Sequence, residues 1–171
     1  KHQISLTAFG SPQRHNQRKP LYAGLSIEEW DKVAKWTGEK DKYRYNAIYG
    51  FDNNGKERSS MLNEYHKPQI SLNHQWQIDH KSSLSTALYV SIGRGSGYSG
   101  QGRTSADRSM WNGSSNGKLL YNFRKSDGTF DYGAIQDMNA ESTSGSKMVM
   151  SKSINNHMWY GLLSTYSNEI A

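Results

Sequence analysis

The chain has 171 residues, enough for one domain, but only 34% of them are hydrophobic and the mean hydropathy is −0.89, so a large apolar core is excluded. The formal net charge of +6 comes from Lys and Arg scattered among acidic residues, without a run of five like charges, which argues against a nucleic-acid-binding protein. Cysteine is absent, which excludes disulfides and thiolate metal sites, and the lack of any stretch of about 18 apolar residues excludes a membrane-spanning helix.

Aromatic residues replace part of the missing aliphatic mass: the chain has 11 Tyr, 5 Trp and 4 Phe, together with 16 Gly and only 3 Pro. This composition favours strands and long polar loops over a helical bundle. Alternation of apolar and polar residues predicts four strands, at about residues 2 to 10, 65 to 78, 83 to 95 and 152 to 166. The sequence therefore predicts an all-β chain.

The chain opens inside the first of these strands, in the run Gln3-Ile4-Ser5-Leu6-Thr7-Ala8-Phe9, and ends just past the last one. Because no initiator Met or signal peptide precedes this run, we expect the chain to be a segment of a longer protein. The first predicted loop, about residues 11 to 64, contains one helix, since Ser26-Ile27-Glu28-Glu29 has the pattern of a capping box and Gly38 is a suitable end. Farther along, Asp52-Asn53-Asn54-Gly55 predicts a turn between two short strands.

The central hairpin is the strongest signal in the chain. Residues 69 to 78 and 83 to 92 both alternate between apolar and polar positions, and Asp79-His80-Lys81-Ser82 turns the chain between them. Each run is about ten residues long, which at a tilt of about 45° matches the thickness of a bilayer's hydrocarbon layer. His74 is the one misfit, because its imidazole points outward with the apolar set. The residues predicted to face lipid are Ile70, Leu72, Trp76, Ile78, Leu84, Leu88, Val90 and Ile92.

The second predicted loop, about residues 96 to 151, begins with a stretch rich in Gly, Ser and Asn. It then predicts a small hairpin, in which residues 118 to 123 pair with residues 129 to 135 around Ser126-Asp127-Gly128. The fourth strand follows this loop and alternates less cleanly. The side chains that share one of its faces are Met158, Tyr160, Leu162 and Tyr166.

The lengths of the connections indicate the architecture. About 54 residues separate the first and second strands, about four the second and third, and about 56 the third and fourth. Outer-membrane barrels alternate short periplasmic turns with long extracellular loops in this way. We therefore predict an antiparallel up-and-down transmembrane β-barrel segment with long extracellular loops and one short loop helix, in which Trp76 and Tyr166 lie in an interfacial aromatic girdle.

Two short motifs match enzyme or cofactor patterns without their structural context. Gly95-Ser96-Gly97-Tyr98-Ser99-Gly100 fits the dinucleotide-binding pattern, but no helical periodicity follows it to hold a pyrophosphate. Gly113-Ser114-Ser115-Asn116-Gly117 fits the nucleophile elbow, but it lies among loop formers and not between a strand and a helix. The six histidines show no metal-ligand spacing either. We expect neither an enzyme nor a metal or other cofactor.

Aromatic and cationic side chains in the long loops are the candidates for ligand contact, because such groups stack on flat ligands and form charge-assisted hydrogen bonds. Packing of the loops against each other is the alternative explanation for each of them. The candidate ligand-binding residues are Arg94, Tyr98, Arg103, Trp111, Tyr121 and Phe130.

Several runs, in order along nearly the whole chain, resemble one family. They are Thr7-Ala8-Phe9-Gly10-Ser11-Pro12-Gln13-Arg14-His15-Asn16-Gln17-Arg18, Tyr65-His66-Lys67-Pro68-Gln69-Ile70-Ser71-Leu72-Asn73, Leu84-Ser85-Thr86, Gly93-Arg94-Gly95 and Asn155-Asn156-His157-Met158-Trp159-Tyr160-Gly161. This pattern is similar to the barrel of TonB-dependent outer-membrane receptors of the SusC-like, Bacteroidota type. Members of that family have a 22-stranded barrel closed by an N-terminal plug.

The resemblance implies that residues 1–171 form part of a receptor barrel in the bacterial outer membrane, with the plug domain absent. Such a receptor binds a nutrient, which could be an oligosaccharide, a peptide or a chelate, and imports it with energy supplied through TonB. The implied partners are the rest of the barrel, the plug, TonB acting through the absent plug, and outer-membrane lipid, but no nucleic acid. Some relatives pair with a surface lipoprotein, so such a lipoprotein is a further candidate partner.

Other interpretations of the same pattern stay open. The alternation also fits a soluble β-sandwich that binds glycans, in which the apolar face covers a protein core. A complete eight-stranded outer-membrane barrel is possible in 171 residues if the weaker loop segments are also membrane strands. An enzyme is the least favoured, and it would require a function for Ser115.

Overall fold

A computed structural model describes residues 1–18 and 24–170 of the chain; residues 19–23 of the predicted first loop lie outside the described residues. The structure is mostly β, with 49% of residues in strands and 18% in helices, so the predicted strand-rich class is confirmed in this coarser form. The chain divides into two compact units. The sheet unit comprises Lys1–Arg14, Glu64–Ser96 and Ile154–Ala171, and the loop unit comprises His15–Asn63 and Gly97–Ser153.

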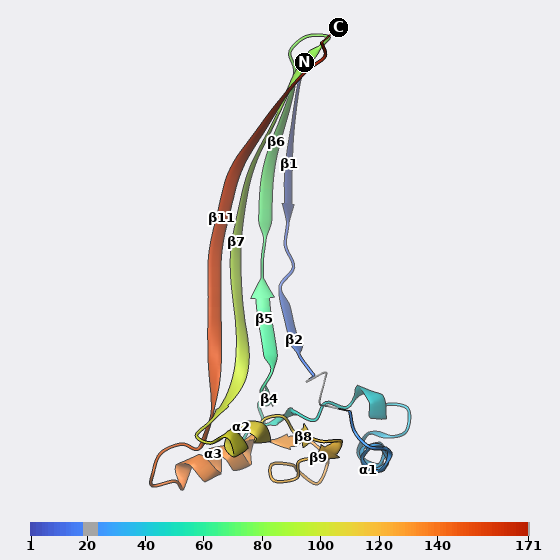
Figure 1. Ribbon diagram of the computed structural model, residues 1–171, viewed down its shortest axis with the longest axis vertical. Helices are drawn as coiled ribbons and strands as arrows, with labels where there is room; N and C mark the ends of the chain where they lie inside the picture. The colour runs from blue at the N-terminus through green and yellow to red at the C-terminus, as the bar shows by residue number, and fades with distance from the viewer. Residues whose placement is uncertain (19–23, 171) are drawn as a thin grey trace. The chain divides into compact units, whose positions relative to one another are not determined.

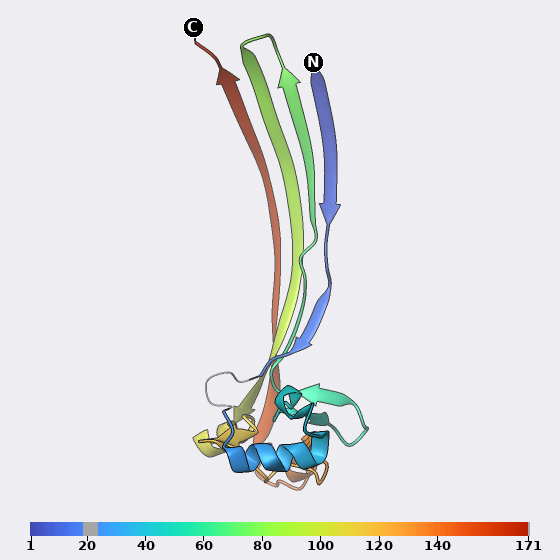
Figure 2. The same cartoon turned by 90° about the vertical axis from the view of Figure 1, so that its right-hand side faces the viewer.

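The main sheet has six strands, and neighbouring strands of the sheet run in opposite directions (Figures 1 and 2). Pairing runs from β1 to β6 to β7 to β5 to β2, and β11 pairs with the other side of β7. This is the predicted antiparallel up-and-down order, but the described strands form an open sheet and not a closed barrel. The strands are β1 (His2–Phe9), β2 (Gln13–Asn16), β5 (Leu62–His66), β6 (Gln69–Gln77), β7 (Ser82–Gly102) and β11 (Met148–Asn168).

The predicted central hairpin is confirmed, because β6 and β7 pair antiparallel on either side of the predicted turn. In β6 and β7, Ile70 lies opposite Val90, and Leu72 lies opposite Leu88. Leu6 of β1 lies opposite Leu72 on the other side. Directly opposed residues of antiparallel strands point to the same face, so the even-numbered apolar residues of all three strands form one continuous surface.

Side chains of β11, which corresponds to the fourth predicted strand, lie on the same surface. The hydroxyl groups of Thr86 and Ser164 lie 3.0 Å apart, which places both side chains on one face. Because alternate residues of a strand share a face, Leu162 and Tyr166 lie on this face together with Ser164. This arrangement agrees with the face predicted for the fourth strand.

The loop unit contains the remaining short elements. Its helices are α1 (Ile27–Thr37), the 3-10 helix η1 (Lys42–Arg44), α2 (Ser105–Met110) and α3 (Tyr132–Ala140). β10 pairs parallel with β3, β3 pairs antiparallel with β4, and β8 pairs antiparallel with β9. These strands are β3 (Tyr49–Phe51), β4 (Glu57–Ser59), β8 (Ser114–Ser115), β9 (Lys118–Leu119) and β10 (Phe130–Asp131).

Helix α1 begins and ends where the sequence predicts. The Ser26 side chain accepts a hydrogen bond from the backbone N–H of Glu29, and Gly38 ends the helix with a φ of 83°. A positive φ suits glycine because it has no Cβ. The Glu29 carboxylate does not complete the capping box; it accepts hydrogen bonds from the Lys32 amine and the Tyr121 hydroxyl at 2.7 and 2.9 Å. These bonds attach α1 to the segment around Tyr121.

The apolar core lies in the loop unit. Its central cluster contains five buried side chains from α2's C-terminal end, β10, α3 and the start of β11: Trp111, Phe130, Tyr132, Ile135 and Met148. The other buried apolar residues described, Val33, Ile48, Leu62 and Leu119, belong to the same unit. Within the described part of the sheet unit, no large apolar side chain is buried.

The structure corrects three predictions about the loops. The predicted single loop helix is wrong, because α2 and α3 form in addition to α1. The predicted hairpin of residues 118–123 and 129–135 is wrong in most of its length: β10 pairs with β3, and residues from Tyr132 onward form α3, capped by the Asp131 side chain. Only the turn and an isolated bridge between Arg124 and Phe130 remain of it. The second loop is also shorter than the predicted 96–151, because β7 continues to Gly102 and β11 begins at Met148.

Candidate functional site

The first candidate site is the apolar face of the sheet unit. Large side chains on this face are open to solvent, with exposed fractions of 47% for Ile70, 43% for Leu72 and 51% for Leu88. The same is true of Leu6 in β1 and Leu162 in β11, at 71% and 70%. No second layer of protein from the described residues covers this surface. Contiguous apolar surfaces of this kind mark contacts with a membrane or with another protein.

The apolar band has a definite length along the strands. On β7 it runs from Leu84 to Ile92, eight residue steps, or roughly 26 Å at about 3.3 Å per residue. Exposed Arg94 follows two residues later on the same face. Beyond it, the Ser96 hydroxyl donates to Glu64 at 3.5 Å, and Glu64 forms an ion pair with Arg14 at 3.1 Å. Charged residues therefore bound the apolar band at this end.

His74, the misfit in the sequence pattern, has a partner on the same face. Its Nε2 lies 2.9 Å from Nδ1 of His2 in β1, and the two rings are nearly parallel. The His2 ring also stacks on Trp76, with centroids 5.2 Å apart. The two imidazoles thus satisfy one hydrogen-bonding position of each other, which lowers the cost of placing them among apolar neighbours.

The opposite face of the sheet unit is polar. It carries the odd-numbered Gln, Ser, Thr and Asn residues of the strands, with a few aromatic residues between them. Glycines on this face accommodate the aromatic rings: a Cβ at Gly161 would lie 2.4 Å from the Tyr89 hydroxyl, and one at Gly93 would lie 2.3 Å from the His157 ring. The sheet unit therefore has one apolar face and one polar face.

The second candidate site is a cleft within the loop unit, with a cavity volume of about 510 Å³. This volume lies in the range of about 300 to 1,000 Å³ that is usual for small-molecule sites. Its walls come from the last residue of β2, the end of α1, η1 and the residues after it, the first residue of β3, and the turn before β10. Its lining residues are Asn16, Thr37, Asp41, Arg44, Tyr45, Asn46, Tyr49, Asp127, Gly128 and Thr129.

The half-buried guanidinium of Arg124 joins the walls of this cleft. Arg124 donates to the carbonyl oxygens of Ala47 and Gly113 at 3.1 and 2.7 Å. It also donates to the carbonyl of Gly128 at 2.9 Å, to that of Leu120 at 3.2 Å, and to the Tyr45 hydroxyl. Burial lowers the pKa of Arg124, and burial raises the pKa of Tyr45 to about 12. One side chain thus joins segments that are far apart in the sequence.

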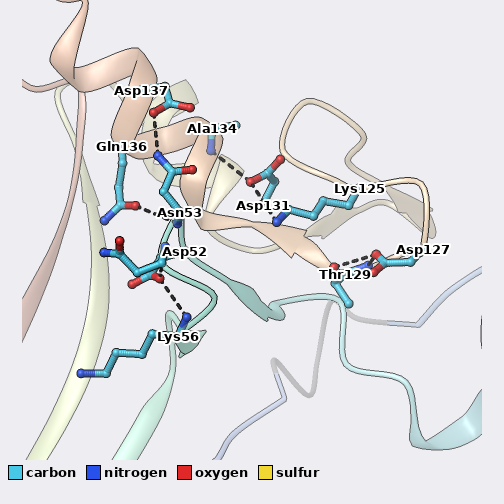
Figure 3. Close-up of polar contacts among 11 residues, drawn as sticks. Asp52, Asn53, Lys56, Lys125, Asp127, Thr129, Asp131, Ala134, Gln136 and Asp137 are labelled. Carbon is cyan, nitrogen blue, oxygen red and sulfur yellow. Dashed lines mark hydrogen bonds and ion pairs between the residues drawn. The ribbon is translucent and has the colours of Figure 1, made fainter.

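A polar loop attaches the β3–β4 turn to α3 (Figure 3). Asn53 donates from its side chain to Asp137 at 2.6 Å, and its backbone N–H donates to Gln136 at 3.2 Å. Buried Asp52 accepts bonds from the backbone of Lys56 at 3.0 Å and from Arg58 at 2.9 Å. Burial alone would raise the pKa of Asp52, but these hydrogen bonds outweigh it and lower the pKa. The predicted turn at residues 52–55 is confirmed, and its hydrogen bonds attach it to α3.

The predicted ligand-binding residues do not converge on one site. Trp111 and Phe130 are 5% and 1% exposed and pack in the core, so we remove both from the ligand-binding set. Arg103 donates to the hydroxyl of Ser144 at 3.0 Å and to its carbonyl. The Tyr121 hydroxyl donates to Glu29 at 2.9 Å.

The two remaining predicted residues lie on β7. Tyr98 carries the Lys152 amine over its ring at 5.2 Å. Arg94 is exposed and belongs to the sheet unit. None of the six predicted residues lines the cleft.

The sequence did not predict the residues that line the cleft, because they do not follow the spacing of any known binding motif. Tyr45, Asn46 and Tyr49 lie close together in the sequence, and this local clustering of aromatic and amide groups is the one signal that would have found part of the site. Asn16 and Thr129 are brought to them only by the fold.

The short motifs have ordinary structural roles. Residues 95–100 lie within the long strand β7, and Ser115 lies exposed in the short strand β8, without the strand-to-helix turn of a nucleophile elbow. Among residues 1–18 and 24–170, no three His, Asp or Glu side chains gather as they do in a metal site. In the same part of the chain, no helix has both the length and the apolar character needed to cross a bilayer.

Comparison with known proteins gives no relatives: no family model, no curated protein and no solved structure matches the chain significantly.

Proposed function

We propose that this chain is part of the barrel wall of an outer-membrane active-transport receptor, which binds a nutrient and imports it with energy supplied through TonB. In this proposal the even-numbered face of β1, β6, β7 and β11 contacts lipid and the odd-numbered face lines the lumen. The loop unit lies on the extracellular side and makes the first contact with cargo. The chain performs no chemistry on that cargo.

One observation carries the proposal: an apolar face that no described residue covers lies opposite a polar face in the same open sheet. In a water-soluble sandwich the apolar face packs on a second sheet, and its residues are buried. In a membrane barrel the apolar face is outward and the polar face is inward, which matches the alternation observed here.

Further features support the membrane interpretation. The band of roughly 26 Å along β7 projects to roughly 18 to 21 Å along the membrane normal at a strand tilt of about 35 to 45°, which covers most of the apolar belt of about 25 Å in outer-membrane barrels. Trp76 and Tyr166 lie toward the end of the sheet that carries the tight turn, where an aromatic girdle is expected. The unpaired edges of β1 and β11 require further strands, which the rest of a barrel would supply.

The two alternatives have less support. A β-sandwich requires a second sheet on the apolar face, and the described residues supply none. A complete eight-stranded barrel requires membrane strands from the loop segments, but those segments form short strands and helices of the loop unit.

Cysteine accessibility tests the proposal directly, because the chain contains no cysteine of its own. Leu88→Cys and Ala87→Cys introduce single thiols at neighbouring positions on opposite faces of β7. In a protein reconstituted into phospholipid vesicles, the thiol of Leu88→Cys is expected to react with a lipid-soluble maleimide and to resist a charged one. The thiol of Ala87→Cys is expected to react with the charged reagent.

The matched pair distinguishes the alternatives. Equal reaction of both variants with the charged reagent, in a chain that remains monomeric in buffer without detergent, would exclude a lipid-facing surface. Protection of the Leu88→Cys thiol in that same detergent-free buffer would instead support a sandwich.

A further inference from the structure

We infer that His2 and His74 bind one soft monovalent cation, of the Ag⁺ or Cu⁺ type, in a linear bridge between their imidazole rings. Both residues belong to the sheet unit. The inference goes beyond the proposed receptor function, because it concerns an ion held on the surface of the sheet and not an imported cargo.

His74 is the residue that interrupts the apolar face of β6, and its neighbour on that face is a second histidine. In the register of β1 and β6, His2 lies opposite Trp76, two residues from His74 on the same face. The Nδ1 atom of His2 and the Nε2 atom of His74 are 2.9 Å apart. The ring planes differ by only 6°, and this contact is shorter than the roughly 3.5 Å between rings packed face to face, so the two nitrogens meet along the ring edges.

The facing nitrogens of the pair can hold a metal ion in place of a proton. A hydrogen bond between two neutral imidazoles needs one protonated and one bare nitrogen. When a cation enters between them, the proton moves to the outer nitrogen of one ring, and both facing nitrogens become donors to the ion. A metal–imidazole bond is about 2 Å long, so the two nitrogens must separate from 2.9 Å to about 4 Å. His2 is exposed and a cavity of about 340 Å³ adjoins it, so rotation of its side chain can supply that distance.

The surroundings of the pair select the charge and the coordination of the ion. Residues 2–9, 69–77 and 82–92 contain no Asp or Glu, so no carboxylate of these strands offsets a second positive charge. The nearest acidic residue along the chain, Asp79, accepts hydrogen bonds from the backbone of Lys81 and Ser82, both at 2.8 Å. Zn²⁺ sites in proteins use three or four protein ligands in a tetrahedron. Closed-shell monovalent ions such as Ag⁺ and Cu⁺ are stable with two neutral nitrogen donors in a line, which is the donor set of this pair.

Trp76 fixes the orientation of His2 and reports on the site. Its ring packs against the His2 imidazole with centroids 5.2 Å apart and planes inclined by 20°. An indole ring stabilises a cation that lies near its face. A heavy ion at this distance also quenches indole fluorescence, so Trp76 supplies an optical signal for occupation of the pair.

Metal titrations test the inference. The whole chain, labelled with ¹⁵N and held in detergent micelles, is titrated with silver nitrate in chloride-free buffer and separately with zinc sulfate. Silver is expected to shift the ¹⁵N resonances of His2 Nδ1 and His74 Nε2 together and to bind at least ten times more tightly than zinc. It is also expected to quench fluorescence in the wild type by a component that Trp76→Phe lacks.

Substitutions separate this pair from other donors. His74→Gln and His2→Gln are each expected to weaken silver binding at least tenfold. His80→Gln, at an exposed histidine in the turn of the same hairpin, is the matched control and is expected to leave binding unchanged. Met158→Leu removes an exposed thioether of the sheet unit, which is another soft donor, and is also expected to leave the two ¹⁵N shifts unchanged.

Several results would overturn the inference. They are a silver-induced shift at only one of the two nitrogens or at neither, zinc binding as tight as silver binding, silver binding that survives both histidine substitutions, and a response that only Met158→Leu removes. The ¹⁵N measurement uses the unaltered chain, so it gives an answer independent of how the variants fold. It is also independent of the cysteine experiment, because the two nitrogens report on the ion and not on contact with lipid.

Discussion

The loop unit and the sheet unit differ in where they place their large apolar side chains. The loop unit buries Trp111, Phe130 and Tyr132 in a packed cluster and ties its segments together through Arg124. The sheet unit buries no large apolar residue among those described and leaves Leu6 and Leu162 71% and 70% exposed. The comparison teaches that the loop unit removes its large apolar side chains from water by its own packing, whereas those of the sheet unit are left accessible by the described residues.

The largest effect is expected from a pair of phenylalanine substitutions. Phe130→Ala should lower the free energy of unfolding of the loop unit by about 3 to 5 kcal/mol, because it leaves a cavity beside Trp111 and Tyr132. Phe9→Ala, at a position 60% exposed in the sheet unit, should cost less than about 1 kcal/mol in the detergent-free protein. Urea unfolding followed by tryptophan fluorescence measures both. Equal losses would mean that the sheet unit has a core of its own.

The next effect concerns the guanidinium in the loop unit. Arg124→Met should lower the free energy of unfolding by at least about 2 kcal/mol, because the carbonyl groups of half-buried Ala47 and buried Gly113 lose their donor. The free energy of unfolding of Arg124→Lys should lie between those of the wild type and the Met variant. The lysine ammonium keeps the charge, but it cannot donate to all the acceptors that the planar guanidinium reaches. The same urea titration provides the measurement. A Met variant as stable as the wild type would show that water replaces the donor.

A smaller effect tests packing on the polar face of the sheet unit. Gly161→Ala should destabilise the pairing of β7 and β11 by up to about 1 kcal/mol, because the new Cβ would overlap the outer end of the exposed Tyr89 side chain and force it to move. Removing the ring in Gly161→Ala/Tyr89→Ala should relieve most of that cost, and a double-mutant cycle measures the coupling. Strictly additive losses would contradict this contact.

The smallest effect is the response of the loop unit to acid. The pKa of Asp52 is lowered in the folded state, so the unfolded chain binds more protons between the lowered and the ordinary values. The stability supplied by Asp52 is present above the ordinary pKa and is lost as the pH falls through the folded pKa. The melting temperature of the loop unit should therefore drop as pH falls below about 4.

Asp52→Asn should make that decline shallower, and Asp31→Asn, at an exposed position of α1, is the matched control. An unchanged slope in the Asp52 variant would show that other carboxylates dominate the acid response.

Sequence reasoning succeeded where local physics decides the structure. The alternation in residues 69–92 predicts which face each side chain occupies, and the register of the structure agrees with it, since Ile70 lies opposite Val90 and Leu72 opposite Leu88. The ends of α1 also follow from local rules, because Ser26 and Gly38 satisfy the free groups at the two termini.

The failures lie where long-range contacts override local preference. Phe130 and Tyr132 alternate as a strand would, yet Tyr132 begins α3, because the Asp131 side chain caps the helix and both rings join a core supplied by distant segments. The cleft was missed for the same reason. Asn16, Tyr49 and Thr129 come from three separate segments and have no common pattern in the sequence.

The bonds of Arg124 have a consequence for how this loop unit can change. Among its described acceptors, those at Ala47, Gly113, Leu120 and Gly128 are main-chain carbonyls, and a carbonyl persists whatever residue occupies the position. Ala47 and Leu120 can therefore be exchanged without loss of the anchor, whereas Gly113 and Gly128 are restricted by positive φ values of 68° and 84°. A unit joined through main-chain carbonyls in this way can change the side chains around Arg124 and keep its fold.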